Sequence, residues 1–152
     1  MPVKVYIRQM TKSDLDGVLA IEQVSYSTPW SREHFLQEMH LHTSFPYVAL
    51  LDKMVIGYLC LMSLFEEAQI LNIAVAPQQR GRGVARMLME LAVSAACERG
   101  AEVLLLEVRE SNAAAIKLYE DFGFKRYFVR KGYYEGKEDA LLMEKILASK
   151  PD

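Results

Sequence analysis

The chain has 152 residues, of which 51% are hydrophobic, and a formal net charge of -2; this composition suits one globular domain, residues 1–152, with a full core. The small net charge gives no electrostatic reason to expect binding to nucleic acid or to an anionic membrane. No apolar run approaches the ~20 residues of a membrane-spanning helix, and the first residues lack the apolar stretch of a signal peptide. We therefore expect a cytoplasmic protein.

The first elements are a strand and a helix. Val3, Val5 and Ile7 alternate with polar residues, which predicts a strand with one buried face near a sheet edge. Thr11 and Asp14 resemble a capping box, which predicts the start of a helix. The core positions expected on this helix are Leu15, Val18, Leu19, Ile21 and Val24.

A second helix and a hairpin are expected next. Ser31 is placed to cap a helix over residues 32–39. The pattern then becomes extended, and residues 47–51 and 54–64 predict two antiparallel strands joined by a two-residue turn.

A buried strand over residues 72–76, a glycine turn and a long helix over 83–99 follow one another. Gly81 and Gly83 let the backbone turn with its amides facing outward. The first amides of the helix lack partners and, with the helix dipole, form a site for phosphate oxygens. On this pattern alone the glycines could equally serve only the turn, and neither common nucleotide-loop motif is present. The cations at this corner are Arg80, Arg82 and Arg86.

A second strand-to-helix corner lies further along. Residues 103–109 form a strongly apolar strand, and 113–121 predict the helix that follows it. Residues 125–132 and 139–146 predict a closing antiparallel pair. The loop between them carries Tyr133, Tyr134 and Gly136. The full order of elements predicts an α/β fold of the mixed α+β kind, with a largely antiparallel sheet in which only the last strand-helix-strand units are parallel.

Both corners carry motifs with family-specific spacing. Arg80-x-x-Gly83-x-Ala85 matches the (Gln/Arg)-x-x-Gly-x-(Gly/Ala) signature of the GNAT acetyltransferase superfamily. Residues 106–124 carry Asn, Ala, Leu-Tyr and Gly-Phe at the spacing of a second GNAT motif. Within the superfamily the chain most closely resembles the RimI-type enzymes, which acetylate the N-terminal alanine of a small-subunit ribosomal protein. This resemblance implies a central, mostly antiparallel sheet with helices on both faces.

The resemblance also implies acetyl-CoA as co-substrate, no metal, and a protein N-terminus as the acceptor. In this family the pantetheine arm runs beside the central strand and the glycine loop holds the pyrophosphate. Asn112 would cap its helix and also bond the pantetheine arm. The implied cofactor-binding residues are Ile73, Ala74, Val75, Gly81, Arg82, Gly83, Val84, Ala85, Arg86 and Asn112. Tyr133 and Tyr134 could wall the peptide cleft, although adjacent hairpin residues point to opposite faces, so we expect at most one to line it.

Two residues are candidates for proton transfer. Glu107 interrupts an apolar strand. From the residues alone, a carboxylate paired with Arg109 or another cation is the simpler interpretation. The resemblance instead aligns Glu107 with the general base of the family. Tyr119 has the spacing of a core tyrosine, and the resemblance aligns it with the general acid. An α-amine, with a pKa near 8, is easier to deprotonate than a lysine, with a pKa of about 10.4.

Alternatives remain open at this stage. The acceptor could instead be a lysine, a polyamine or a small amine. The chain could also be a catalytically silent module that binds acyl-CoA without transferring the acyl group. Cys60 and Cys97 are not placed for an acyl intermediate, so direct transfer in a ternary complex is expected. His34, His40 and His42 lie in no metal-binding pattern.

Overall fold

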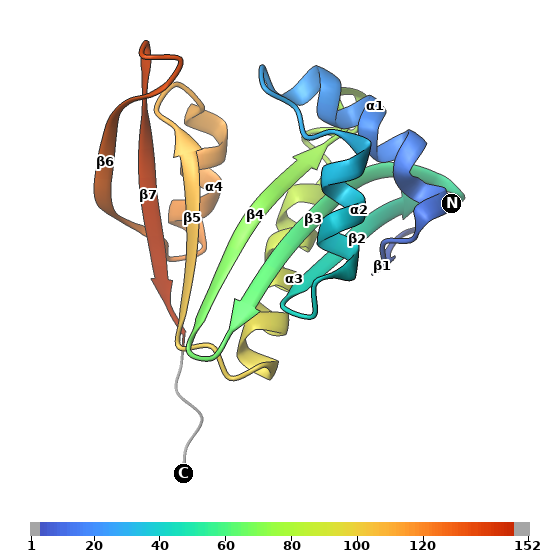
Figure 1. Ribbon diagram of the computed structural model, residues 1–152, viewed down its shortest axis with the longest axis horizontal. Coiled ribbons are helices and arrows are strands. Elements are labelled where there is room, and N and C mark those ends of the chain that lie inside the picture. Colours follow the sequence, from blue (N-terminus) through green and yellow to red (C-terminus); the bar gives the residue numbers. More distant parts are fainter. Residues whose placement is uncertain (1–3, 148–152) are drawn as a thin grey trace. The chain divides into compact units, whose positions relative to one another are not determined.

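The computed structural model describes residues 4–147, and these fall into two compact units (Figure 1). Unit 1 contains the described residues through Met62 together with Asn72–Ala92, and unit 2 contains Ser63–Leu71 and the described residues from Val93 onward. Val3, which we expected in the first strand, lies outside the described residues.

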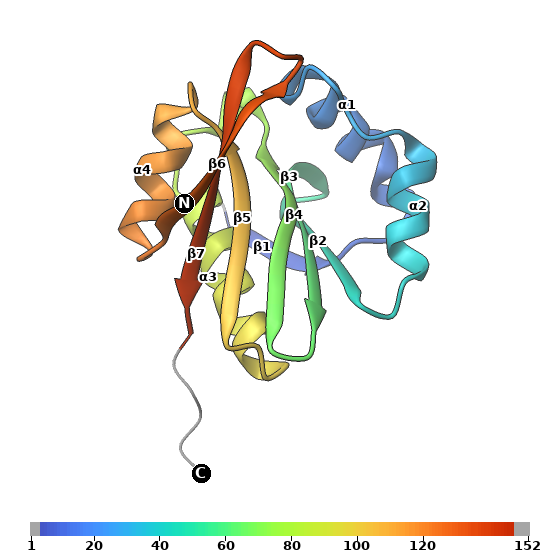
Figure 2. The same cartoon turned by 60° about the vertical axis from the view of Figure 1, so that its left-hand side comes forward.

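Unit 1 contains the N-terminal elements and the end of the central strand. Its elements are β1 (Val5–Gln9), η1 (Lys12–Asp14), α1 (Leu15–Ser25), α2 (Arg32–His40), β2 (Ser44–Leu51), most of β3 (Met54–Leu64), the second half of β4 (Glu67–Val75), η2 (Pro77–Gln79) and the first part of α3 (Val84–Glu98). Within this unit α1 and α2 lie on one face of the strands and α3 on the other (Figures 1 and 2).

Unit 2 contains the second corner and the closing strands. Its elements are the first half of β4, the end of α3, β5 (Val103–Arg109), α4 (Ala113–Asp121), β6 (Lys125–Tyr134) and β7 (Glu138–Ile146). No helix among residues 4–147 is long and apolar enough to cross a membrane.

The strands follow the order β1-β2-β3-β4-β5-β7-β6. The β1–β2, β2–β3, β5–β7 and β6–β7 pairs are antiparallel, whereas β4 and β5 are parallel, with Glu67–Gln69 opposite Val103–Leu105. The mixed α/β fold with a mostly antiparallel sheet is therefore confirmed, and its parallel pair is joined by a helix as expected.

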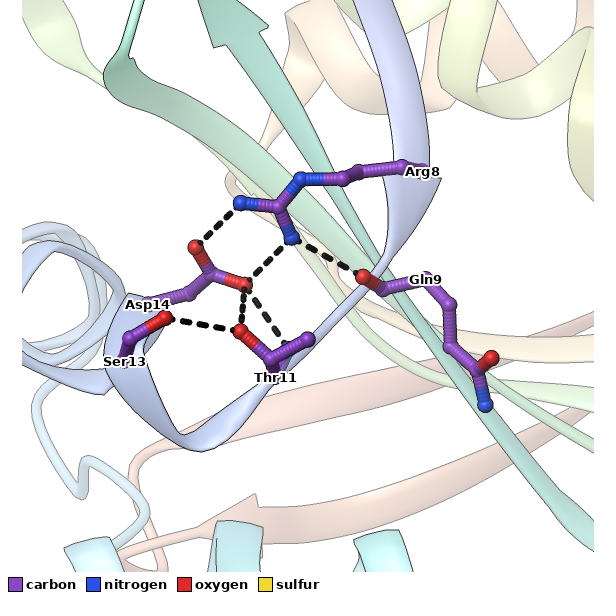
Figure 3. Close-up of polar contacts among 5 residues, drawn as sticks. All are labelled: Arg8, Gln9, Thr11, Ser13 and Asp14. Atoms are coloured by element: carbon purple, nitrogen blue, oxygen red, sulfur yellow. Dashed lines mark hydrogen bonds and ion pairs between the residues drawn. The ribbon is translucent and has the colours of Figure 1, made fainter.

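The start of α1 is closed by a polar network (Figure 3). Arg8 donates two hydrogen bonds to the Asp14 carboxylate, at 2.7 and 2.8 Å, and the Thr11 amide donates a third at 2.7 Å. Burial by itself would raise the pKa of Asp14, but the hydrogen bonds from Arg8 and Thr11 outweigh it, and the pKa is lowered. The predicted capping box is confirmed.

The buried face of α1 differs from the expected one at several positions, and Leu19, which we expected in the core, is only half-buried. Leu15, Val18 and Ile21 are buried as predicted, but Val24 is 67% exposed and Glu22 is buried instead. The helix period explains this, because Glu22 follows Leu15 by seven residues and lies on the same face, whereas Val24 faces the opposite side.

The first part of α3 packs closely on β3. A Cβ added to Gly57 would lie 3.0 Å from the Ala74 carbonyl oxygen and within 3.5 Å of the Val84 and Leu88 side chains. A side chain at position 57 would have to displace the Ala74 carbonyl or α3 slightly, so glycine lets β3, β4 and α3 approach closely here. This packing supports β4 and the corner that follows it.

In unit 2, β5 has a buried face and a half-buried one. Leu104, Leu106 and Val108 are buried, while Glu107 lies on the alternate, half-buried face. The placement of Tyr133 and Tyr134 in a loop was wrong. Both belong to β6, because the pairing with β7 continues as far as Tyr134 opposite Glu138.

Candidate functional site

The second half of β4 has one edge facing β3 and one facing away. The Ala76 amide donates to the Ile56 carbonyl of β3 at 2.8 Å. Because successive residues of a strand present their backbone groups to alternate edges, Ile73 and Val75 direct theirs to the edge away from β3. The structure thus puts two of the predicted cofactor-binding residues on that edge, with Ala74 between them facing β3.

Side chains already engage the carbonyls of that edge. The Tyr26 hydroxyl donates to the Ile73 carbonyl at 2.5 Å, and Nε of Arg80 donates to the Val75 carbonyl at 3.2 Å. The two carbonyls are therefore occupied, and the edge offers a ligand only the N–H donors of Ile73 and Val75. A neighbouring strand would require alternating donors and acceptors. A ligand rich in carbonyl oxygens suits such an edge.

The glycine turn follows directly. Gly81 and Gly83 have φ values of 77° and 83°, in the left-handed region, and a Cβ added at either would meet no atom within 4 Å. The requirement for glycine is thus conformational, and the space beside the turn is open. The Met87 amide donates to the Gly83 carbonyl at 3.0 Å, so α3 starts here with a residue that has no side chain to cap it.

The side chains around the turn divide into two groups. Val84 is part of the core, so a ligand could meet only its backbone. Ala85 is half-buried, whereas Arg82 and Arg86 are exposed; NH1 of Arg82 donates to the Gln79 side chain at 3.4 Å. Open space, two left-handed glycines and exposed cations at a helix start fit a phosphate group.

In unit 2, Glu107 is part of an ion pair. NH1 of Arg130 lies 3.1 Å from Oε1 of Glu107, and the side chain of Glu107 is 26% exposed. The sequence left open whether Glu107 pairs with Arg109 or with another cation, and the partner is Arg130. Arg109 instead lies 3.0 Å from Glu138, with its guanidinium 4.0 Å from the Tyr134 ring centre.

Glu138 ties the β5–α4 corner together, a role that sequence reasoning missed. Its two oxygens accept from Arg109, at 3.0 Å, and from the Ser111 amide, at 2.8 Å. The hydrogen bonds from Ser111 and then from Arg109 hold the pKa of Glu138 below its ordinary value. Asn112 caps α4 by accepting from the Ala115 amide at 3.2 Å, so the predicted cap is confirmed.

Tyr119 lies inside α4 with its side chain against Phe124, at 6.0 Å between ring centres. Burial, with a smaller contribution from Tyr134, raises its pKa to about 12. At neutral pH the phenol is therefore protonated and can donate a proton but not accept one. Tyr119 is thus a buried tyrosine, as its spacing predicted, in the protonation state that a general acid requires.

The two tyrosines at the end of β6 contact each other and different arginines. Their rings meet edge to face at 5.2 Å, and the Arg130 guanidinium lies 5.3 Å from the Tyr133 ring centre. Arg130 thereby links Tyr133 to Glu107. Neither this link nor the Tyr134 contact with Arg109 could be read from the sequence, because both arise from the pairing of β7 with β5 on one side and with β6 on the other.

Both cysteines are free thiols. Burial raises the pKa of the Cys60 thiol, so it remains protonated, and Cys97 is half-buried on α3. Within residues 4–147, no group of three or more His, Cys, Asp or Glu side chains could hold a metal ion.

Comparison with known proteins gives concordant matches. The model of the acetyltransferase (GNAT) family matches residues 15–124. The ribosomal protein bS18-alanine N-acetyltransferase of Salmonella typhimurium is 36% identical over 138 residues, which covers 88% of this chain and 92% of that protein. Its Escherichia coli (strain K12) counterpart is 36% identical over 143 residues, covering 90% and 94%. The crystal structure of the ribosomal-protein-S18-alanine N-acetyltransferase from Escherichia coli has a TM-score of 0.90 and 31% identity, covering 98% and 97%.

Proposed function

Because the chain belongs to the GNAT acetyltransferase family and is an acetyl-CoA-dependent N-acetyltransferase, we propose that it acetylates a protein N-terminal α-amine, with the N-terminal alanine of ribosomal protein bS18 as acceptor. The observation that carries this proposal is the 36% identity, over about nine-tenths of the chain, with relatives named for that acceptor. The element order and the chemistry of both corners are compatible with it.

Unit 1 supplies the binding of acetyl-CoA in this proposal. The bound co-substrate contributes an activated acetyl thioester. The amides of Ile73 and Val75 donate to carbonyl oxygens of the pantetheine arm, which lies along the free edge of β4. The backbone of the turn from Gly81 to Arg86 holds the pyrophosphate, and the cations Arg82 and Arg86 offset its charge.

Unit 2 supplies the proton transfers. Glu107 takes one proton from the acceptor ammonium, directly or through water, and the neutral amine nitrogen bonds to the acetyl carbon as the carbon–sulfur bond breaks. The nitrogen then loses its second proton to solvent, which leaves the neutral amide. Tyr119, whose phenol is protonated at neutral pH, gives its proton to the departing sulfur and is reprotonated from solvent. Deprotonating an α-amine at pH 7 costs about 1 kcal/mol, against roughly 4 to 5 kcal/mol for a lysine, so a terminal amine places the smaller demand on a single carboxylate.

We assign peptide contacts to the end of β6. Tyr133 is the more exposed of the two tyrosines, and both rings are supported by arginines. Asn112 keeps its cap and adds a contact to the pantetheine arm. All of these assignments assume direct transfer of the acetyl group from acetyl-CoA to the amine. The protonated, buried Cys60 is unsuited to carry an acyl group in between.

The test measures thiol release from acetyl-CoA with two peptides. One begins with a free alanine and contains no lysine; the other has a blocked N-terminus and one internal lysine. Turnover with the free terminus alone is expected. Turnover with the lysine peptide alone would overturn the acceptor and leave the acetyltransferase activity intact. If neither peptide reacts while acetyl-CoA still raises the melting temperature, a small-amine acceptor or a silent acyl-CoA-binding module explains the chain better.

A further inference from the structure

A fully buried carboxylate lies at the end of α1, outside the residues assigned above. Glu22 is 1% exposed. Its Oε2 accepts from the Trp30 amide at 2.8 Å, and its Oε1 accepts from Nδ2 of Asn72 at 2.9 Å and from the Tyr58 hydroxyl. An unpartnered buried carboxylate is costly, and these three donors offset that cost. They come from the α1–α2 loop, from β3 and from β4, so one side chain joins three segments of unit 1.

A second contact joins the same end of α1 to the next residue of β4. Tyr26 follows Glu22 by four residues, and its amide donates to the Glu22 carbonyl at 3.2 Å, so the two side chains leave the helix on the same side. Glu22 holds Asn72, and Tyr26 donates to the carbonyl of Ile73. We call these two paired contacts the α1–β4 clamp.

The clamp acts where the co-substrate's reactive end would lie, and this step rests on the proposed function. The pyrophosphate is assigned to the turn at Gly81–Gly83, which follows β4. The pantetheine arm therefore runs back along β4 from Val75 toward Asn72, and its thioester end comes nearer to Ile73 than to Val75. A donor aimed at the thioester oxygen stabilises the charge that develops there only if the donor is held in place before the reaction.

We propose that Glu22 and Tyr26 are positioning residues for acetyl transfer, which hold Ile73 so that its amide is aimed at the thioester carbonyl. A clamp on the carbonyl of Ile73 fixes the orientation of that strand edge, and with it the direction of the Ile73 amide. Loosening it slows the transfer step and leaves the phosphate contacts, and hence most of the acetyl-CoA affinity, unchanged.

The first test is Tyr26→Phe, which removes only the hydroxyl. The matched control is Tyr6→Phe in β1, a tyrosine at least as exposed as Tyr26. We expect kcat to fall about tenfold in Tyr26→Phe, with the KM for acetyl-CoA within about twofold of the wild-type value. The control should keep both parameters. An unchanged kcat, or a loss confined to the KM for acetyl-CoA, would overturn the proposal.

The second test addresses the buried carboxylate. In Glu22→Gln the NH2 group of the new side chain faces the hydrogen-bond donors that now bond the carboxylate, so both stability and kcat should fall. Glu22→Asp keeps the charge and should recover part of kcat. If Glu22→Gln does not fold, Tyr26→Phe still decides the matter. Equal kcat in the folded Gln and Asp variants would contradict a positioning role for the carboxylate.

A third readout needs no acceptor, and so separates this proposal from the proposed function. Hydrogen exchange is followed in the peptide containing residues 72–76 with and without saturating acetyl-CoA. We expect acetyl-CoA to slow exchange there in the wild type. In Tyr26→Phe the factor by which acetyl-CoA slows exchange should be at least threefold smaller. Equal protection in both proteins would overturn the clamp, whatever the acceptor is. A wild type without turnover on any amine would overturn only the proposed function.

Discussion

The two strand-to-helix corners have the same local plan and treat the first amides of their helices in opposite ways. Where β4 turns into α3, Gly83 occupies the capping position and the space beside the turn is open. Where β5 turns into α4, Asn112 caps the helix and Glu138 binds the Ser111 amide. The first corner leaves donors for a ligand, and the second uses them to stabilise the fold.

In the proposed function, one kind of supersecondary unit serves co-substrate binding at the first corner and catalysis at the second. An anion site needs amides without internal partners and a backbone that can turn without side chains. A catalytic carboxylate needs a fixed position, which a capped and tied corner provides. The first corner thus has the free amides, and the second corner the fixed side chains, that their proposed roles require.

Glu107→Gln should have the largest effect and tests the chemical role of the second corner. Gln cannot accept the proton of the amine, so kcat should fall by roughly 10²- to 10³-fold. The affinity for acetyl-CoA, measured by calorimetry, should remain that of the wild type. A variant with wild-type kcat would reduce Glu107 to a structural partner of Arg130.

Gly83→Asp would convert the open corner into a closed, acidic one. A carboxylate at the helix start should compete with the pyrophosphate, and we expect acetyl-CoA to bind about 10- to 100-fold more weakly, by calorimetry. Gly100→Asp is the matched control, because Gly100 has nearly the same φ, 84°, and equally open surroundings. Weakening of the same size in both variants would show that backbone strain, and not the anion site, is responsible.

Asn112→Ala would remove the cap from the closed corner. Loss of an N-cap costs about 1 kcal/mol in the free energy of unfolding, measured with urea. Ser31→Ala is a matched control, since Ser31 caps α2 with a bond of similar length, 3.1 Å, to the His34 amide. Both variants should lose similar stability, but only Asn112→Ala should raise the KM for acetyl-CoA. Identical KM values would leave Asn112 as a cap alone.

Asp14→Asn should have the smallest effect and extends the comparison to the start of α1, which is also closed by side chains. The folded pKa of Asp14 is lowered, so its carboxylate adds stability above its unfolded pKa of about 3.9, and this stability is lost as the pH falls below that value. Because the Arg8 side chain is 41% exposed and solvent screens the pair, we expect a loss of about 0.5 to 1 kcal/mol at pH 7. Urea unfolding at pH 7 and pH 3 should show the difference between variant and wild type shrinking in acid.

Local patterns predicted most elements, and their failures have a physical cause. Capping residues and helical spacing located α2 and α4 to within a residue, whereas the capping box at Thr11 opens η1 and α1 begins after it, at Leu15. The assignment of Val24 to the core failed because an apolar residue was preferred over Glu22, which lies on the correct face but is charged. No local rule could justify burying that carboxylate, since Asn72 lies 50 residues away along the chain.

The sequence by itself determined the order of elements, the glycine turn before α3, the caps at Thr11, Ser31 and Asn112, and the family signature. Each of these depends on residues within a few positions of one another. Only the tertiary structure decided that Arg130 rather than Arg109 pairs with Glu107, that Glu138 ties the second corner, and that the end of α1 is clamped to β4. The physical reason is that strand register and helix packing bring these partners together, and both arise from contacts between residues far apart in the chain.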